Sequence, residues 1–252
     1  MKSLFKSIII SLILLISPLG LYAAGGGGHA AMKKANVDLS SKTALQRGAK
    51  VFVNYCVSCH SASFMRYNRI AEDLGLSEEA VETNLMFTTE KIGDTMNIAM
   101  DPADSEAWFG VTPPDLSVIA RSRGADWLFN FLQGYYLDET KSTGVNNLIF
   151  TDTAMPHVLA DLQGLNRAMF NVEVDEQGNE HKFFAGFENV IPGSQTSEQY
   201  EQTVRDLVTF LVYLGEPAKL VRYKLGFWVL AFLFVLWGAT YLLKREYWND
   251  VH

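Results

Sequence analysis

The feature that most constrains this chain is an uncharged, apolar run of 19 residues from Leu225 to Leu243. A helix of that length, rising about 1.5 Å per residue, crosses roughly 30 Å of hydrocarbon, so the run predicts a transmembrane helix. The alternative is a buried helix of a soluble core, which so long an uncharged run disfavours. Basic residues flank both ends, Arg222 and Lys224 before the run and Lys244 and Arg245 after it. Flanking charge alone therefore does not fix the orientation.

A second apolar run, Ile8 to Ile16, lies near the N-terminus, with two lysines before it and a Pro-Leu-Gly break after it. A short apolar stretch with a basic start and small residues behind it is typical of a secretory signal peptide, with cleavage near Ala23 or Ala24. An uncleaved anchor is the alternative, and the shortness of the run disfavours it. Export would place everything before the C-terminal span outside the cytoplasm.

These two runs divide the chain into five predicted segments. They are a cleaved signal peptide over 1–24, a flexible N-terminal segment over 25–42, a periplasmic domain over 43–219, a transmembrane anchor over 222–245 and a cytoplasmic tail over 246–252. The formal charge is −7, and an acidic exported domain is a poor binder of nucleic acid. Its field could steer a basic partner, or the charge could serve solubility alone.

Apolar periodicity predicts a mainly α-helical domain with long loops. Helices are expected over 43–54, 77–86, 125–136 and 197–215, and a small β-hairpin over 170–187. The first helix contains Gly48, which costs about 1 kcal/mol against alanine and so predicts the close approach of another helix. The helix over 197–215 is the candidate partner. With few helices and much loop, the core would be marginal unless something large sat in its middle.

The chain has two cysteines, Cys56 and Cys59 in the stretch VNYCVSCHSASF, and His60 follows at once. A redox disulfide at this spacing expects a thioredoxin-like βαβ pattern, whereas the residues before Cys56 are helical in pattern. A structural zinc site needs four ligands, and adjacent Cys59 and His60 are awkwardly placed to bind one ion. Cys-x-x-Cys-His is the attachment signal of c-type haem, and export fits that chemistry. The sequence therefore predicts one haem c, joined through both thiols and ligated by His60.

A sixth iron ligand remains to be found, and methionine suits an electron carrier because the thioether favours reduced iron. Four of the eight methionines are poorly placed, because they lie outside the domain, beside the motif or at the start of the expected hairpin: Met1, Met32, Met65 and Met169. The remaining candidates are Met86, Met96, Met100 and Met155. Pro156 holds the Met155 segment extended, but spacing alone does not choose among them. His157 is a rival, which would give a bis-histidine iron of lower potential.

Several blocks of the sequence resemble those of the cytochrome c1 family, the haem subunits of the cytochrome bc1 complex. They are CVSCH, PPDLSVIARSR over 113–123, AMPHVL over 154–159, DLVTFLVYLGEP over 206–217 and the single C-terminal span, in that order. Many c-type cytochromes share the first block, whereas PPDLS with a C-terminal anchor is far more selective. His157 stands where many members have a run of prolines, a departure that resembles proteobacterial members. The additional cysteine pair of some bacterial members is absent.

The resemblance implies a class I cytochrome c fold, with the helix around Gly48 packed across Leu207–Tyr213 and the haem between them. It further implies His60 as the proximal and Met155 as the distal ligand, Arg123 or else Arg121 on a haem propionate, Pro114 at the haem edge and Tyr67 lining the pocket. Ordinary surface arginines and a packed aromatic are the plainer alternatives for Arg123, Arg121 and Tyr67.

The implied function is electron transfer without bond chemistry on a substrate, as a redox subunit of proton-translocating ubiquinol–cytochrome c oxidoreductase. A Rieske iron–sulfur protein would reduce the haem, and a soluble or membrane-tethered cytochrome c would oxidise it. Cytochrome b would lie beside the anchor in a dimeric complex of the bacterial inner membrane, with the haem domain in the periplasm. The alternatives are a stand-alone membrane-anchored monohaem cytochrome c that serves an oxidase, and a haem-based ligand sensor with an open sixth position.

Overall fold

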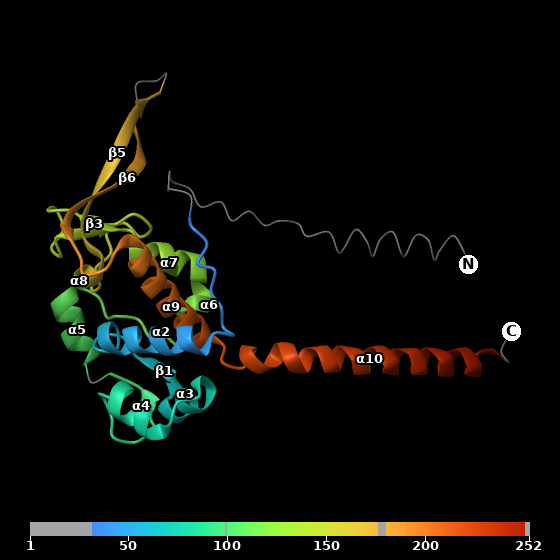
Figure 1. Cartoon of the computed structure of the whole chain (residues 1–252). Helices are drawn as coiled ribbons and strands as arrows, with labels where there is room; N and C mark the ends of the chain where they lie inside the picture. The colour runs from blue at the N-terminus through green and yellow to red at the C-terminus, as the bar shows by residue number, and fades with distance from the viewer. Residues whose placement is uncertain (1–31, 99, 176–179, 250–252) are drawn as a thin grey trace.

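The computed structural model of the chain describes residues 32–98, 100–175 and 180–249. A helical domain carries one long helix, α10 (Lys219–Tyr247), which extends away from it (Figure 1). The fold is mainly α, as predicted, and it also contains three antiparallel strand pairs, of which only one, a hairpin, was predicted. Several short elements lie where the sequence predicted loops. The predicted signal peptide lies outside the described residues.

The centre of the domain is the crossing of α2 (Lys42–Tyr55) with α9 (Ser197–Gly215). The buried face of α2 includes Leu45, Ala49 and Phe52, and the Phe52 ring lies 5.6 Å from that of Phe210 on α9. Gly48 sits at the crossing point. A Cβ on it would lie 2.7 Å from the backbone carbon of Asp206 and 2.8 Å from the Phe210 Cβ, and closer still to the Asp206 carbonyl oxygen. The predicted close approach at Gly48 is confirmed, and α9 is the partner.

Helix α9 begins and ends as its sequence indicates. The Thr196 side chain accepts from the Gln199 amide while the Gln199 side chain accepts from the Thr196 amide, a capping box that pairs two otherwise free N–H groups. The helix ends at Gly215. An ion pair also ties the two central helices, because both Arg47 Nε (2.6 Å) and Nη2 (3.2 Å) donate to the nearly buried Asp206 carboxylate.

Shorter elements surround this pair. The helices are α3 (Tyr67–Leu74), α4 (Glu78–Leu85), α5 (Pro102–Phe109), α6 (Ile119–Ser122), α7 (Ala125–Gln133) and α8 (Ala160–Gln163). The paired strands are β1 (Ala62–Arg66) with β2 (Thr95–Met96), and β3 (Tyr135–Leu137) with β4 (Val145–Asn147). The helix predicted over 125–136 is therefore too long: it ends before Gly134, and Tyr135 begins a strand.

The third pair, β5 (Gly164–Val174) with β6 (Glu180–Pro192), is longer than the small hairpin predicted and projects from the domain (Figure 1). Its register shifts twice, between Leu165 and Asn166 and between Met169 and Phe170. These shifts break the strict alternation by which a strand is recognised. Met169 lies within β5 rather than at the start of the hairpin, and the expected turn residues lie outside the described residues.

The N-terminal residues described are attached to the domain. Lys33 exchanges two backbone hydrogen bonds with the Asn130 side chain, and the amide of Ala35 donates to Asp126, 2.8 Å away. Ala35 itself is 1% exposed. The segment expected to be flexible over 25–42 is thus held against α7 at residues 33–35, because its backbone finds partners there.

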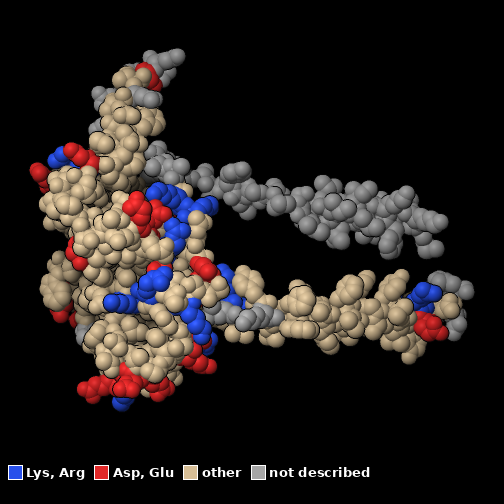
Figure 2. Space-filling model, in the orientation of Figure 1, with Lys and Arg blue, Asp and Glu red and all other residues tan. Residues whose placement is uncertain are grey.

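Helix α10 has the length and composition of a membrane span over Val221–Tyr247, and none of its apolar window is buried in the protein. In Figure 2 its middle carries no charged side chain on the visible face. The same view shows Lys and Arg gathered on the part of the domain nearest α10, with acidic side chains prominent along the lower edge. A buried helix of a soluble core, the alternative to a span, does not describe α10.

Candidate functional site

The Cys-x-x-Cys-His motif forms a single turn at the C-terminal end of α2. The amides of Cys59 and His60 both donate to the Cys56 carbonyl, at 3.0 Å and 2.8 Å. This turn brings the two thiols and the imidazole within one short stretch of backbone. Both thiols are free, and Cys56 is buried whereas Cys59 is partly exposed.

The two other chemistries considered for the cysteines find little support in this geometry. Burial, with a smaller contribution from nearby Cys59, raises the pKa of the Cys56 thiol to about 12. The thiolate is the form that exchanges disulfides and binds metals. A thiol with so high a pKa is therefore poorly suited to disulfide exchange or to zinc binding. Among the described residues, no group of three or more His, Cys, Asp or Glu is placed to hold a metal ion.

His60 is oriented by a hydrogen bond across 54 residues of sequence. Its Nδ1 lies 2.7 Å from the Pro114 carbonyl oxygen, and because a carbonyl can only accept, Nδ1 carries the proton. Burial lowers the pKa of His60, against smaller opposing effects of the Pro114 carbonyl and Asp115. The result is a neutral imidazole with Nε2 as its available lone pair, the form that binds a metal. These residues fit a c-type haem: two thiols in one turn, followed by an oriented imidazole.

The Pro114 carbonyl that orients His60 belongs to the PPDLS block, residues 113–117, which is held in place by hydrogen bonds of Asp115 and is here called the clamp. The Asp115 carboxylate accepts from the Ser63 amide (2.9 Å) and hydroxyl (2.6 Å) and from the Ser117 amide (2.7 Å). The Leu116 amide donates to the Ser61 carbonyl at 2.8 Å. The block is thereby fastened to the residues that follow His60. Pro114 orients His60 through its carbonyl, and its place at the haem edge stays a prediction.

Met155 lies half-buried on the loop between β4 and α8 and packs against the core. Its carbonyl accepts from the Tyr135 hydroxyl at 3.2 Å, and its amide donates to Thr153 Oγ1 at 3.3 Å. Met86 and Met96, two of the alternatives, are buried in the core at 8% and 0% exposure. Met100 is partly exposed, as Met155 is. Burial therefore disfavours Met86 and Met96 and leaves Met100 and Met155 as candidates.

Two buried amides that the sequence did not single out shape this loop. Asn146 Oδ1 accepts from the Asp152 amide at 2.9 Å, and Asn147 Oδ1 accepts from the amides of Ile149 and Phe150. Asn147 also donates to the Phe131 carbonyl at 2.8 Å. Their signal in the sequence is a pair of adjacent asparagines between Val145 and the apolar residues Leu148 and Ile149, because amides buried among apolar residues must find partners.

His157, the rival ligand, is committed elsewhere. Its ring stacks on that of Tyr135, with the centroids 4.7 Å apart and the planes 5° from parallel. Burial lowers its pKa to about 4. Its Nε2 atom is buried and without a hydrogen-bond partner among the described residues. A nitrogen so enclosed has no open space for an iron, which favours Met155 over His157.

The two arginines predicted for a propionate differ in their surroundings. The Arg123 guanidinium lies over the rings of Trp127 (5.1 Å) and Phe150 (5.8 Å), whereas the Arg121 stem packs beside Gly215 at the end of α9. Both are exposed, and neither forms an ion pair within the described part of the chain. Tyr67 is fully buried, and its hydroxyl pairs with Thr88 rather than with a residue of the motif.

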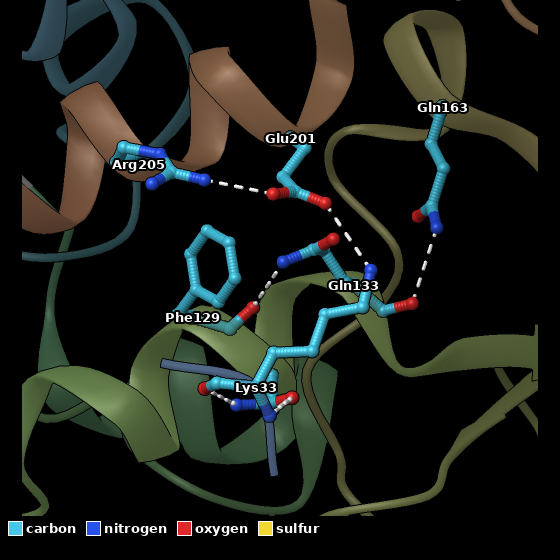
Figure 3. A network of polar contacts seen from close by, with 7 residues as sticks. Lys33, Phe129, Gln133, Gln163, Glu201 and Arg205 are labelled. Atoms are coloured by element: carbon cyan, nitrogen blue, oxygen red, sulfur yellow. Dashed lines mark hydrogen bonds and ion pairs between the residues drawn. The ribbon is translucent and has the colours of Figure 1, made fainter. Parts of the chain in front are cut away.

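A separate polar network joins α7 to α9 (Figure 3). Lys33 pairs with Glu201, which in turn pairs with Arg205, while the Gln163 side chain donates to the Gln133 carbonyl at 3.1 Å. A pocket of about 550 Å³ adjoins it, lined also by the base of the hairpin. None of the site residues predicted from the sequence lines this pocket.

Fold and site together define a c-type cytochrome with an apolar C-terminal helix. The chain matches the model of the Cytochrome C1 family over residues 34–251. It is 45% identical to cytochrome c1 of Allochromatium vinosum, over 98% of this chain and 100% of that one. It is 47% identical to a Nitrosomonas europaea protein named ammonia monooxygenase gamma subunit, over 96% of this chain and 97% of that one. It is 27% identical to cytochrome c1 of Rhodospirillum rubrum, over 82% and 81%.

The chain belongs to the cytochrome c1 family, as its motifs predicted. Membership makes it a haem-carrying electron-transfer subunit of the cytochrome bc1 complex, with cytochrome b and a Rieske protein as the implied neighbours. The family implies haem c, with which the two cysteines are consistent, and α10 fits the membrane anchor.

Proposed function

We propose that this chain carries one haem c, joined through Cys56 and Cys59, with His60 and Met155 as the iron ligands. It accepts an electron from the Rieske iron–sulfur protein and passes it to a cytochrome c. The domain over 43–219 lies in the periplasm of a bacterium, anchored in the inner membrane by 222–245 within a dimeric bc1 complex. The signal peptide is 1–24 and the cytoplasmic tail 246–252.

The observation that carries this proposal is the hydrogen bond from His60 Nδ1 to Pro114. It fixes both the tautomer and the direction of a neutral imidazole one residue after the second thiol. When bound, the haem supplies a one-electron couple whose potential its axial ligands set. The protein's own contribution is to orient His60 through the clamp at Asp115 and to offer Met155 from a loop whose backbone is bonded on both sides.

Arg123 and Arg121 support the propionate assignment, because neither has a carboxylate partner among the described residues. Of the two, Arg123 lies over the rings of Trp127 and Phe150, and such a contact through the face of the guanidinium leaves its N–H groups, which lie in the guanidinium plane, available to a carboxylate. Arg121 remains the second candidate.

Helix α5 supplies a surface for the electron acceptor. It lies on the side of the domain opposite to α10 (Figure 1), four residues before Pro113. Trp108 on this helix is 65% exposed, and the same short segment carries exposed Asp104 and Glu106 and the exposed N-cap residue Asp101. An exposed aromatic among carboxylates suits a partner whose own contact patch is apolar with a basic rim.

The ligand assignment is tested with Met155→Leu in the haem-loaded, detergent-solubilised protein. The variant should lose the methionine–iron charge-transfer band, bind carbon monoxide when reduced and show a lower midpoint potential. Met100→Leu is the matched control, since Met100 is the other partly exposed candidate. A Met155→Leu protein with an unchanged band and potential contradicts the assignment.

The alternative of a stand-alone carrier is tested by purification from the membrane under mild detergent. A bc1 subunit should co-purify with a b-type cytochrome and an iron–sulfur protein. A monohaem cytochrome that elutes alone, yet reduces an oxidase, contradicts the proposed complex.

A further inference from the structure

We propose that Tyr135 is a positioning residue for Met155, holding the backbone of that residue so that its thioether is presented to the iron. The inference rests on the proposed ligand role of Met155. It does not make Tyr135 a ligand itself, because the hydroxyl contacts the Met155 backbone rather than its sulfur.

Both backbone hydrogen-bonding groups of Met155 have partners. The Tyr135 hydroxyl donates to its carbonyl at 3.2 Å, and its own amide donates to Thr153 Oγ1 at 3.3 Å. Thr153 is 8% exposed and Tyr135 2% exposed, so water does not easily replace either partner. The following residue, Pro156, has a fixed φ. These contacts restrain the backbone of Met155 and leave its side-chain torsions free of hydrogen bonds.

The Tyr135 ring is itself held on two sides. His157 stacks on it with centroids 4.7 Å apart, and Phe131 packs edge-on at 5.5 Å. Phe131 in turn stacks on Trp127 at 5.0 Å and 9°. These four residues form an aromatic stack that begins on α7 with Trp127 and Phe131, continues through Tyr135 of β3 and ends at His157. This packing restricts rotation of the Tyr135 side chain and so fixes the position of its hydroxyl group.

Tyr135 is also connected to the start of the loop that contains Met155. Tyr135 pairs with Asn147 across β3 and β4, and Asn147 bonds both the Phe131 carbonyl and the amides that begin the loop. The loop that contains Met155 and the Tyr135 ring are therefore both attached to the β3–β4 strand pair. In this proposal His157 is the last ring of the stack: it packs against Tyr135 and is not an iron ligand.

The chemical need for such a device follows from the weakness of a neutral thioether as a ligand. An unconstrained methionine would lose backbone and side-chain freedom on binding the iron, and pre-organisation removes the backbone part of that cost. Loss of one such hydrogen bond should therefore accelerate dissociation of Met155 from the iron without abolishing ligation.

The test compares Tyr135→Phe with Tyr136→Phe in the full-length haem-loaded protein. Tyr135→Phe keeps the aromatic stack and removes only the hydroxyl. Tyr136 is the next residue on the same strand, and its hydroxyl forms no hydrogen bond within the described part of the chain. The readout is the rate at which cyanide binds the ferric haem at saturating cyanide, where departure of methionine limits the reaction, together with the charge-transfer band.

Tyr135→Phe should bind cyanide about fivefold faster than the wild type, the factor that one net hydrogen bond represents, with a weaker charge-transfer band. Tyr136→Phe should match the wild type. Thr153→Val, which removes the acceptor for the Met155 amide, should change the rate in the same direction and serves if Tyr135→Phe fails to load haem. Identical rates in Tyr135→Phe and Tyr136→Phe, with the band lost in Met155→Leu, would overturn the positioning role alone. A band retained in Met155→Leu would overturn the ligand assignment, and the positioning role with it.

Discussion

Replacement of Gly48 by alanine tests the packing at the centre of the domain, because two effects oppose each other there. Helix propensity alone predicts that Gly48→Ala stabilises α2 by about 1 kcal/mol. The structure predicts the opposite, since the new Cβ would lie 2.7 Å from the Asp206 carbonyl carbon and 2.8 Å from the Phe210 Cβ. Ordinary contacts of this kind are about 3.5–4.0 Å. The neighbour at the closest point is backbone, which cannot rotate away.

To relieve the clash, α2 and α9 must separate by about 1 Å, which forfeits a quarter to a half of the dispersion energy of each contact across the crossing. Overpacking of this kind costs up to about 3 kcal/mol, so the net effect after the propensity gain is a loss of about 2 kcal/mol. For a domain of this size that loss corresponds to a fall of about 4–8 °C in Tm.

Thermal and urea unfolding of the detergent-solubilised, haem-loaded protein, followed by the Soret band and far-UV circular dichroism, measure this loss. Gly93→Ala is the matched control, because nothing lies within 4 Å of a Cβ at that position, and its stability should change by less than about 0.5 kcal/mol. A Gly48→Ala protein as stable as the wild type, or more so, refutes the reasoning.

Three further predictions concern other parts of the domain. Thr196→Ala, which removes the capping box with Gln199, should destabilise the domain by about 1 kcal/mol in urea, and an unchanged urea midpoint counts against the cap. Burial opposes ionisation of Asp115, but hydrogen bonds from Ser117 and Ser63 outweigh it and lower its pKa. The stability that it contributes is therefore present above its unfolded pKa and lost as pH falls through the lower folded value. Wild type should lose stability below about pH 4 more steeply than Asp115→Asn, and parallel profiles would contradict this. Trp108→Ala should slow reduction of a basic cytochrome c severalfold at every ionic strength with little change in the salt dependence, because the ring carries no charge; an unchanged rate excludes α5 as the docking surface.

The central helix pair could be predicted from the sequence because its signals are local. Apolar periodicity marks both helices, and Gly48 in the middle of one predicts a close neighbour. The C-terminal span could also be predicted from local sequence, since an uncharged apolar run of that length is seldom found in other structures. The cysteine motif predicts a haem from local sequence, because two thiols and an imidazole in one turn suit two vinyl groups and an iron. Export and the lack of further zinc ligands disfavoured the alternatives.

The rest of the site depends on contacts between residues far apart in the sequence. Nothing local to Pro114 indicates that its carbonyl orients an imidazole 54 positions earlier. Tyr135 was predicted inside the helix expected over 125–136, yet that helix ends before Gly134 and Tyr135 begins a strand. The hairpin was predicted too short because two register shifts interrupt its alternation.

The join between α9 and α10 has a consequence for motion. Only residues 216–218 separate the two helices, and Glu216 at that join pairs with Arg222 in the first turns of α10. Gly215 packs against Arg121, which steadies the same corner. So short and braced a connection restricts rotation of the domain relative to α10. With α10 in the membrane, as proposed, it would hold the haem at a fixed height above the bilayer. A domain held in this way cannot approach its partners. Any movement that shortens the electron-transfer distances must therefore be made by the electron donor and the electron acceptor.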